Sequence, residues 1–119
     1  MSFFRKQLGA SGEVLAEKYL RQKNYKILGR NIRLKFGEID ILAQKGEDIV
    51  LVEVKTKTSL GFGAPFEEVD YFKKKKLWNL ARAVSQKYPD KNIRVDVVSI
   101  LMLHNNEPQI EHIENAVEF

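Results

Sequence analysis

Two acidic residues and a lysine are of types that could cleave a phosphodiester bond if the fold brings them together. Glu53 and Lys55 interrupt or end the apolar run 49–54. In a strand they would share one face with Leu51, because successive side chains point to opposite faces. Asp40 lies in the apolar-rich segment just before, separated from that run by a turn that contains Gly46. If the polar faces of the two strands point the same way, Asp40, Glu53 and Lys55 converge.

Such a group of side chains has a specific chemical use. Mg²⁺ is commonly held by one or two carboxylates together with phosphate oxygens and water. A lysine beside them can stabilise charge that develops on the phosphorus centre, or orient and deprotonate the attacking water. The same charges also suit an ordinary ion-pair row on a half-exposed sheet. Spacing alone leaves both interpretations open.

A third acid comes from the predicted first helix, residues 9–23. Its apolar stripe is formed by Leu8, Leu15, Ala16, Tyr19 and Leu20. On a helical wheel Glu13 lies about 20° from Leu20, at the edge of that stripe. We therefore expect Glu13 to face the body of the protein.

The remaining patterns predict one α/β domain over residues 1–119. Alternating or continuous apolar runs predict strands at residues 25–33, 38–43, 49–55, 93–103 and 109–117. A second helix is expected over residues 67–88, where Pro89 ends it. The order α-β-β-β-α-β-β predicts a mixed sheet flanked by helices.

Composition excludes several classes of site. The 119 residues contain no cysteine, which removes disulfides, thiol catalysis and cysteine-ligated metals. His104 and His112 have no histidine or carboxylate at recognisable ligand spacing, and we read both as non-ligands. The apolar runs are too short to span a bilayer, and the first residues do not resemble a signal peptide. We expect a cytoplasmic protein with no membrane partner.

The charge distribution favours an anionic partner. Lysine and arginine number 20 against 16 acids, for a net charge of +4. The candidate phosphate contacts are Arg33, Lys35, Lys57, Lys73, Lys74 and Lys76. Five of them have a structural alternative: a charged strand edge for Arg33 and Lys35, a solvated helix face for Lys74 and Lys76, and a stem that only covers apolar surface for Lys73.

Several motifs in order resemble the small bacterial YraN-like family. They are Gly12-Glu13, Asn31-x-Arg33, Gly37-Glu38-Ile39-Asp40, Val52-Glu53-Val54-Lys55, Arg94-x-Asp96-Val97-Val98 and Ile110-x-His112-Ile113-x-Asn115-Ala116. That family resembles the PD-(D/E)xK nuclease superfamily, with its restriction-endonuclease-like fold, and is similar to archaeal Holliday junction resolvases. The resemblance covers essentially the whole chain.

The resemblance implies a role for each matched residue. Asp40 and Glu53 would bind Mg²⁺ or Mn²⁺, Lys55 would be the catalytic lysine, and Glu13 would complete the site. The implied activity is metal-dependent endonuclease cleavage of DNA, with branched or junction DNA as substrate. A chain of this size covers little DNA, so symmetrical cleavage would require a homodimer. Two alternatives stay open: a non-catalytic nucleic-acid-binding module of the same fold, and a scaffold that binds a protein through Trp78 and the loop 61–66.

Overall fold

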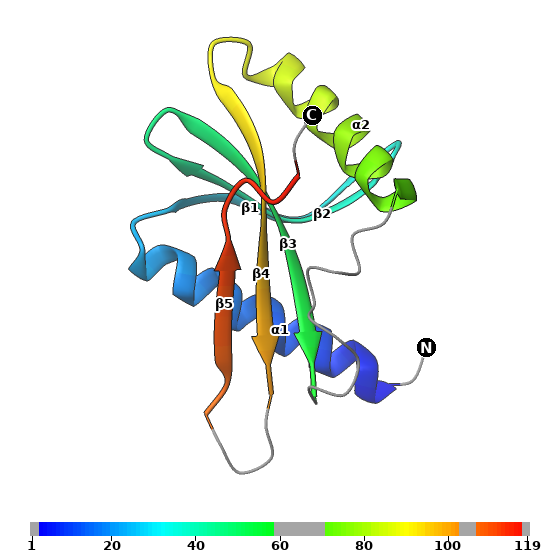
Figure 1. Ribbon diagram of the computed structural model, residues 1–119, viewed down its shortest axis with the longest axis vertical. Helices are drawn as coiled ribbons and strands as arrows, with labels where there is room; N and C mark the ends of the chain where they lie inside the picture. The colour runs from blue at the N-terminus through cyan, green and yellow to red at the C-terminus, as the bar shows by residue number, and fades with distance from the viewer. Residues whose placement is uncertain (1–2, 59–70, 103–106, 118–119) are drawn as a thin grey trace.

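The protein folds into a five-stranded sheet with one helix on each face (Figure 1). The computed structural model describes residues 3–58, 71–102 and 107–117, with side chains from residue 11 onward in the first helix and from residue 73 onward in the second. The elements in chain order are α1 (Phe3–Gln22), β1 (Lys26–Leu34), β2 (Gly37–Lys45), β3 (Asp48–Lys57), α2 (Tyr71–Lys87), β4 (Asn92–Leu101) and β5 (Gln109–Ile113). This confirms the mixed sheet, the flanking helices and the predicted order.

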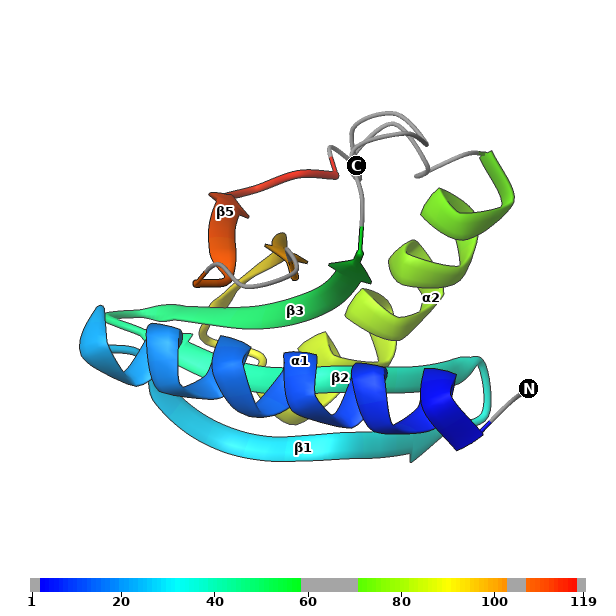
Figure 2. The ribbon, with the colours of Figure 1, turned by 90° about the horizontal axis from the view of Figure 1, so that it is seen from below.

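The strands lie side by side in their sequence order, β1-β2-β3-β4-β5. Three neighbouring pairs are antiparallel, and only β3 and β4 run parallel. A parallel pair needs a crossover connection, and α2 lies between these two strands in the chain. Figure 2 shows α1 along one face of the sheet and α2 on the other.

Some predicted boundaries were wrong. The first helix begins at Phe3 rather than residue 9, because a single glycine such as Gly9 is tolerated inside a helix. The last strand ends at Ile113 rather than residue 117. There Asn115 adopts a left-handed φ of 50°, and its backbone N–H donates to the Asp96 carboxylate at 3.0 Å instead of continuing the strand.

The strand alternation builds two apolar layers. Val50 and Val52 pack with Ala16 and Leu20 on the α1 side. On the other side Leu51 packs with a group that includes residues of α2: Leu77, Leu80, Ala81 and Val84. The face of β3 that carries Leu51 therefore looks toward α2, as do the next residues of that face, Glu53 and Lys55.

A glycine brings α1 against the sheet near those residues. Gly12 is buried, and a Cβ at this position would overlap the Thr56 hydroxyl of β3. Only glycine allows this approach without displacement of one element. The contact places Glu13, the next residue of α1, beside the end of the sheet where β2 and β3 carry their acids.

A buried carboxylate in the middle of β4 ties neighbouring elements together. Asp96 is fully buried and accepts hydrogen bonds from Arg94 Nε at 3.0 Å and His112 Nε2 at 2.7 Å. Arg94 also pairs with Asp48 at 2.8 Å and donates to the Tyr25 hydroxyl at 2.7 Å. Burial alone would raise the pKa of Asp96, but these donors outweigh it and lower the pKa. Asp96 thus joins β4 to β3, β5 and the start of β1.

No helix in the described part of the chain is long and apolar enough to cross a membrane. The predicted single domain over residues 1–119 and the cytoplasmic location stay predictions.

Candidate active site

The site forms where β2 and β3 stop pairing. Their register runs from Lys45 opposite Asp48 to Ile41 opposite Val52. One residue further, the Asp40 carboxylate accepts the backbone N–H of Val54 at 2.9 Å. The side chain thus satisfies a strand donor that would otherwise need a partner, and the bond holds Asp40 between the two strands.

Glu53 brings two lysines to this point. Its Oε1 lies 2.9 Å from Lys73 Nζ of α2 and 3.8 Å from Lys55 Nζ of β3. Both Glu53 and Lys55 are largely buried, each with 17% of the side chain exposed. The predicted convergence of the acids and Lys55 is thus present, and a second ammonium accompanies it.

Asn31 ties the third acid to the site. With its amide nitrogen turned toward Glu13 and Glu38, Asn31 donates at 2.9 Å to one oxygen of each. The residue has a left-handed φ of 51°, a conformation that asparagine tolerates better than most side chains. Sequence reasoning gave Asn31 no role in the site, although the residue lies in the Asn31-x-Arg33 motif.

Burial and the neighbouring negative charges raise the pKa of two carboxylates in the cluster. Burial raises the pKa of Asp40 to about 7; the Val54 N–H lowers it, while the charges of Glu53, Glu13 and Glu38 raise it further. Burial likewise raises the pKa of Glu13, against the lowering effects of Arg30 and Asn31. A bound cation would relieve both effects, since an opposite charge favours the ionised carboxylate.

Lys73 is held in its charged form. Burial lowers the pKa of Lys73, but its hydrogen bonds with Lys55 and Glu53 and the charges of Glu53 and Asp40 outweigh that effect, so the pKa is raised. The sequence suggested only that Lys73 reaches toward the site or a phosphate. The Lys73 ammonium lies closer to the Glu53 carboxylate than the Lys55 ammonium does.

The acids enclose little free space. Glu38, Asp40 and Glu53 line a cavity of about 10 Å³ above the apolar side chains of Leu51, Leu77 and their neighbours, which is room for about one water. Among the residues that the structure describes, no three His, Cys, Asp or Glu side chains are grouped closely enough to hold a metal ion. A metal here would have two protein carboxylates at most.

Most predicted phosphate contacts lie outside this cluster. Arg33 is 85% exposed and lies 3.5 Å from Glu38, while Lys35 and Lys74 are exposed. Lys76 is also exposed, with its side chain against Gly37. Lys57 is half-buried at the end of β3. Loop 61–66 and His104 lie outside the described residues. His112 bonds Asp96 rather than this site.

Fold and site together define an α/β protein with an acidic and lysine-containing centre at a strand divergence. Residues 12–100 match the family described as "Uncharacterised protein family UPF0102", and the chain belongs to that family. This confirms the YraN-like resemblance.

Its relatives match over almost their whole length. A UPF0102 protein of Geobacter metallireducens is 47% identical over 120 residues, covering 99% of this chain and 98% of the relative. One from Thermodesulfovibrio yellowstonii is 47% identical over 116 residues, covering 94% and 96%. A chain of the solved EndoMS–dsDNA2 complex is 19% identical with a TM-score of 0.45, covering 77% of this chain and 36% of that one.

Proposed function

We propose that the protein is a metal-dependent DNA endonuclease that hydrolyses phosphodiester bonds. One observation carries the proposal: Asp40 and Glu53 line the same small cavity at the divergence of β2 and β3, and Lys55 and Lys73 lie 3.8 and 2.9 Å from Glu53. Strongly perturbed pKa values cluster at functional sites, and burial raises the pKa of Asp40 to about 7. Branched or junction DNA as the substrate follows from the family resemblance.

The donor set suits Mg²⁺ or Mn²⁺. Mg²⁺ keeps several waters and is often bound by one or two carboxylates plus substrate phosphate oxygens, which fits Asp40 and Glu53 as the two protein ligands. When bound, the ion would supply Lewis-acid stabilisation and a more acidic water. It would also offset the burial and, to a smaller extent, the repulsion that raise the pKa of Asp40 and Glu13.

The chain's own residues would divide the remaining work. Val54 orients the Asp40 carboxylate through its N–H. The charged Lys73 neutralises Glu53 and leaves Lys55, its neighbour, to orient and deprotonate the attacking water. Glu13, fixed by Asn31, completes the anionic rim. Exposed Arg33, Lys35, Lys74 and Lys76, with half-buried Lys57, would hold the flanking phosphates.

Cleavage of labelled four-way junctions, flaps, single strands and duplexes tests the proposal, with Mg²⁺, Mn²⁺ or EDTA. We expect cutting that needs the metal and is lost in Glu53→Ala and Lys55→Ala. Lys75→Ala, an exposed lysine on the same helix, is the matched control and should still cut. Circular dichroism verifies that each variant is folded.

Three outcomes would contradict the proposal. Cutting that continues in both substituted proteins would indicate a contaminating nuclease. No cutting of any substrate by folded wild type, with DNA binding that weakens steeply with salt, would favour the non-catalytic binding module. No DNA binding would favour the protein scaffold.

A further inference from the structure

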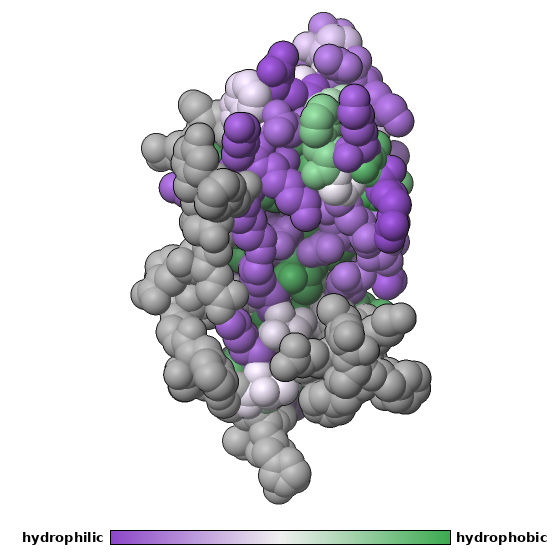
Figure 3. Space-filling model, turned by 90° about the vertical axis from the view of Figure 1, so that its right-hand side faces the viewer, coloured by the Kyte–Doolittle hydropathy of each residue, from purple (hydrophilic) through white to green (hydrophobic). Residues whose placement is uncertain are grey.

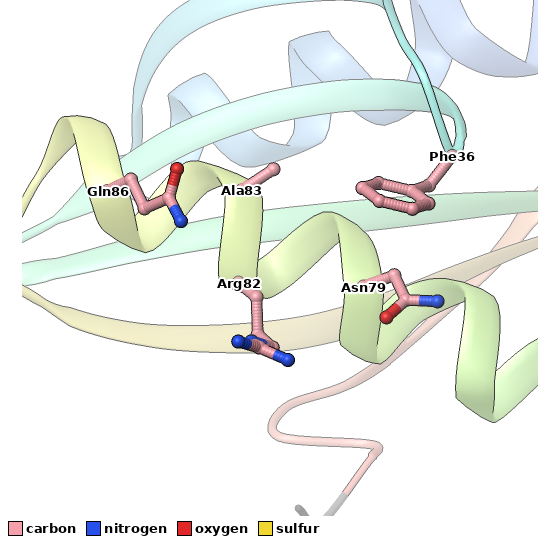
Figure 4. Close-up of a pocket in the computed structure, with 5 residues that line it drawn as sticks. All are labelled: Phe36, Asn79, Arg82, Ala83 and Gln86. Carbon is pink, nitrogen blue, oxygen red and sulfur yellow. The ribbon is translucent and has the colours of Figure 1, made fainter.

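A groove outside the candidate active site lies between the β1–β2 turn and α2. It has a volume of about 220 Å³ and is lined by Phe36, Asn79, Arg82, Ala83 and Gln86. Figure 4 shows the Phe36 ring reaching from the turn toward α2, on the side where Ala83 and Asn79 lie.

The groove presents aromatic surface to solvent. Phe36 is 46% exposed and the neighbouring Trp78 of α2 is 40% exposed. The Arg82 guanidinium lies 4.7 Å from the centre of the Trp78 ring, and Lys35 Nζ lies 6.0 Å from the centre of the Phe36 ring. Cations above aromatic faces are favourable. The groove is thus an aromatic site with cations at its margin.

The charge of α2 indicates what kind of partner would fill it. The helix carries Lys73–Lys76, Arg82 and Lys87 and has no acidic residue. Hydrophilic residues cover most of the coloured surface on this side of the molecule (Figure 3). A purely apolar protein partner would leave these cations without a counter-charge, whereas a nucleic acid strand supplies phosphates for them and flat bases for the aromatic rings.

We propose that the groove binds an unpaired base of a DNA strand whose phosphates lie along α2. The base would stack on Phe36, with its edge toward the side-chain amides of Asn79 and Gln86, which can both donate and accept hydrogen bonds. This rests on the proposed function and narrows its substrate class to DNA with unpaired bases, such as flaps, single strands and junctions that contain unpaired bases.

The groove is well placed for such a substrate. Phe36 precedes Asp40 by four residues, which is about 13 Å at about 3.3 Å per residue of strand. Lys76, whose side chain lies against Gly37, stands between the groove and the acids. A strand that places one base in the groove could therefore place a nearby phosphodiester at Asp40 and Glu53.

Binding in EDTA tests this inference independently of cleavage. The probes are a fluorescent single strand, the same strand with abasic sites in place of its central bases, and the matching duplex. We expect wild type to prefer the strand that retains its bases. Phe36→Ala should weaken binding of that strand about 5- to 150-fold, the range for loss of one stacking contact, with little change for the duplex.

Two variants separate stacking from general apolar contact. Phe36→Leu retains apolar volume without an aromatic face and should lose most of the preference. Ile110→Ala removes another exposed apolar side chain, 37% exposed on β5 at the opposite edge of the sheet, and should bind all three probes like wild type.

The inference is overturned if Phe36→Ala binds the strand with bases as tightly as wild type, if abasic sites do not weaken binding, or if wild type does not bind single strands. The groove inference stands, and the proposed function fails, if wild type binds the strand with bases more tightly than the abasic strand but cuts no DNA with metal. The groove inference fails, and the proposed function stands, if two results are found together. Phe36→Ala still cuts DNA with metal as wild type does, and wild type binds the abasic strand as tightly as the strand with bases.

Discussion

At the scale of single residues, the site depends on carboxylates kept closer together than their charges favour. Asp40 shows this most clearly, because burial and three neighbouring acids raise its pKa to about 7. Ionised Asp40 therefore costs folding free energy near neutral pH. Active sites commonly retain such unfavourable arrangements because the function needs them.

Asp40→Asn should accordingly be more stable than wild type. Asparagine keeps an oxygen for the Val54 N–H but carries no charge. At pH 8 in EDTA we expect an increase of about 1 kcal/mol or more in the free energy of unfolding by urea, since one pKa unit corresponds to about 1.4 kcal/mol. Added MgCl₂ should raise the Tm of wild type but not that of Asp40→Asn. Equal or lower stability of the variant would show that Asp40 is not under strain.

At the scale of elements, close contacts decide where the acids lie. The approach of α1 to β3 at Gly12 carries Glu13 to the sheet end, and the divergence of β2 from β3 admits the Asp40 side chain. The Asp96 cluster ties β4 to β5 through His112 and to β3 through Arg94. These contacts position side chains without taking part in the chemistry.

Gly12→Ala should lower the free energy of unfolding by about 1–3 kcal/mol, the range for overpacking of a buried site. The added Cβ would overlap the Thr56 hydroxyl. Thr56→Ala removes that oxygen, so the double variant should recover part of the loss in a double-mutant cycle. Ser11→Ala, at the exposed position before it, should stay within about 0.5 kcal/mol of wild type. A loss that Thr56→Ala leaves unchanged would contradict this contact.

Asp96 should govern stability in acid. Its pKa is lowered in the folded protein, so its contribution is present above the unfolded pKa, near 4, and is lost as the pH falls through the folded pKa. Asp96→Asn should lose about 3–5 kcal/mol at pH 7, because Arg94 remains without its buried partner. The wild-type advantage should shrink toward pH 3 in urea titrations. Exposed Asp90→Asn is the control, and the same loss there would point to a nonspecific charge effect.

At the scale of the whole molecule, positive charge is concentrated on α2, beside the acidic site. The helix places Lys73 at Glu53, and it also carries the exposed Lys74 and Lys76. The arrangement surrounds a negative cluster with cations that a polyanion can contact. Phosphate contacts of this kind add affinity without sequence preference.

DNA binding should weaken steeply with salt. Removal of both Lys74 and Lys76 should reduce the slope of log K against log[salt] by about 2, since each phosphate contact contributes about 0.9. The matched control replaces Lys18 and Lys26, two exposed lysines on α1 and β1, and should keep the wild-type slope. Equal slopes for the two double variants would mean that α2 does not contact the phosphates.

The sequence alone determined the order of elements and most of the candidate site. Strand alternation put Glu53 and Lys55 on one face, and the helical stripe turned Glu13 inward, because local periodicity reflects local burial. The sequence did not predict where β5 ends, because a tertiary hydrogen bond to Asp96 turns the chain at Asn115.

The tertiary structure alone decided which distant groups meet. Lys73 comes closer to Glu53 than Lys55 does, Asn31 bridges Glu13 and Glu38, and Phe36 faces α2 across a groove. These contacts depend on how far β2 and β3 diverge and on how closely α1 and α2 approach the sheet. Packing of side chains distant in sequence sets those distances, and no local pattern encodes them.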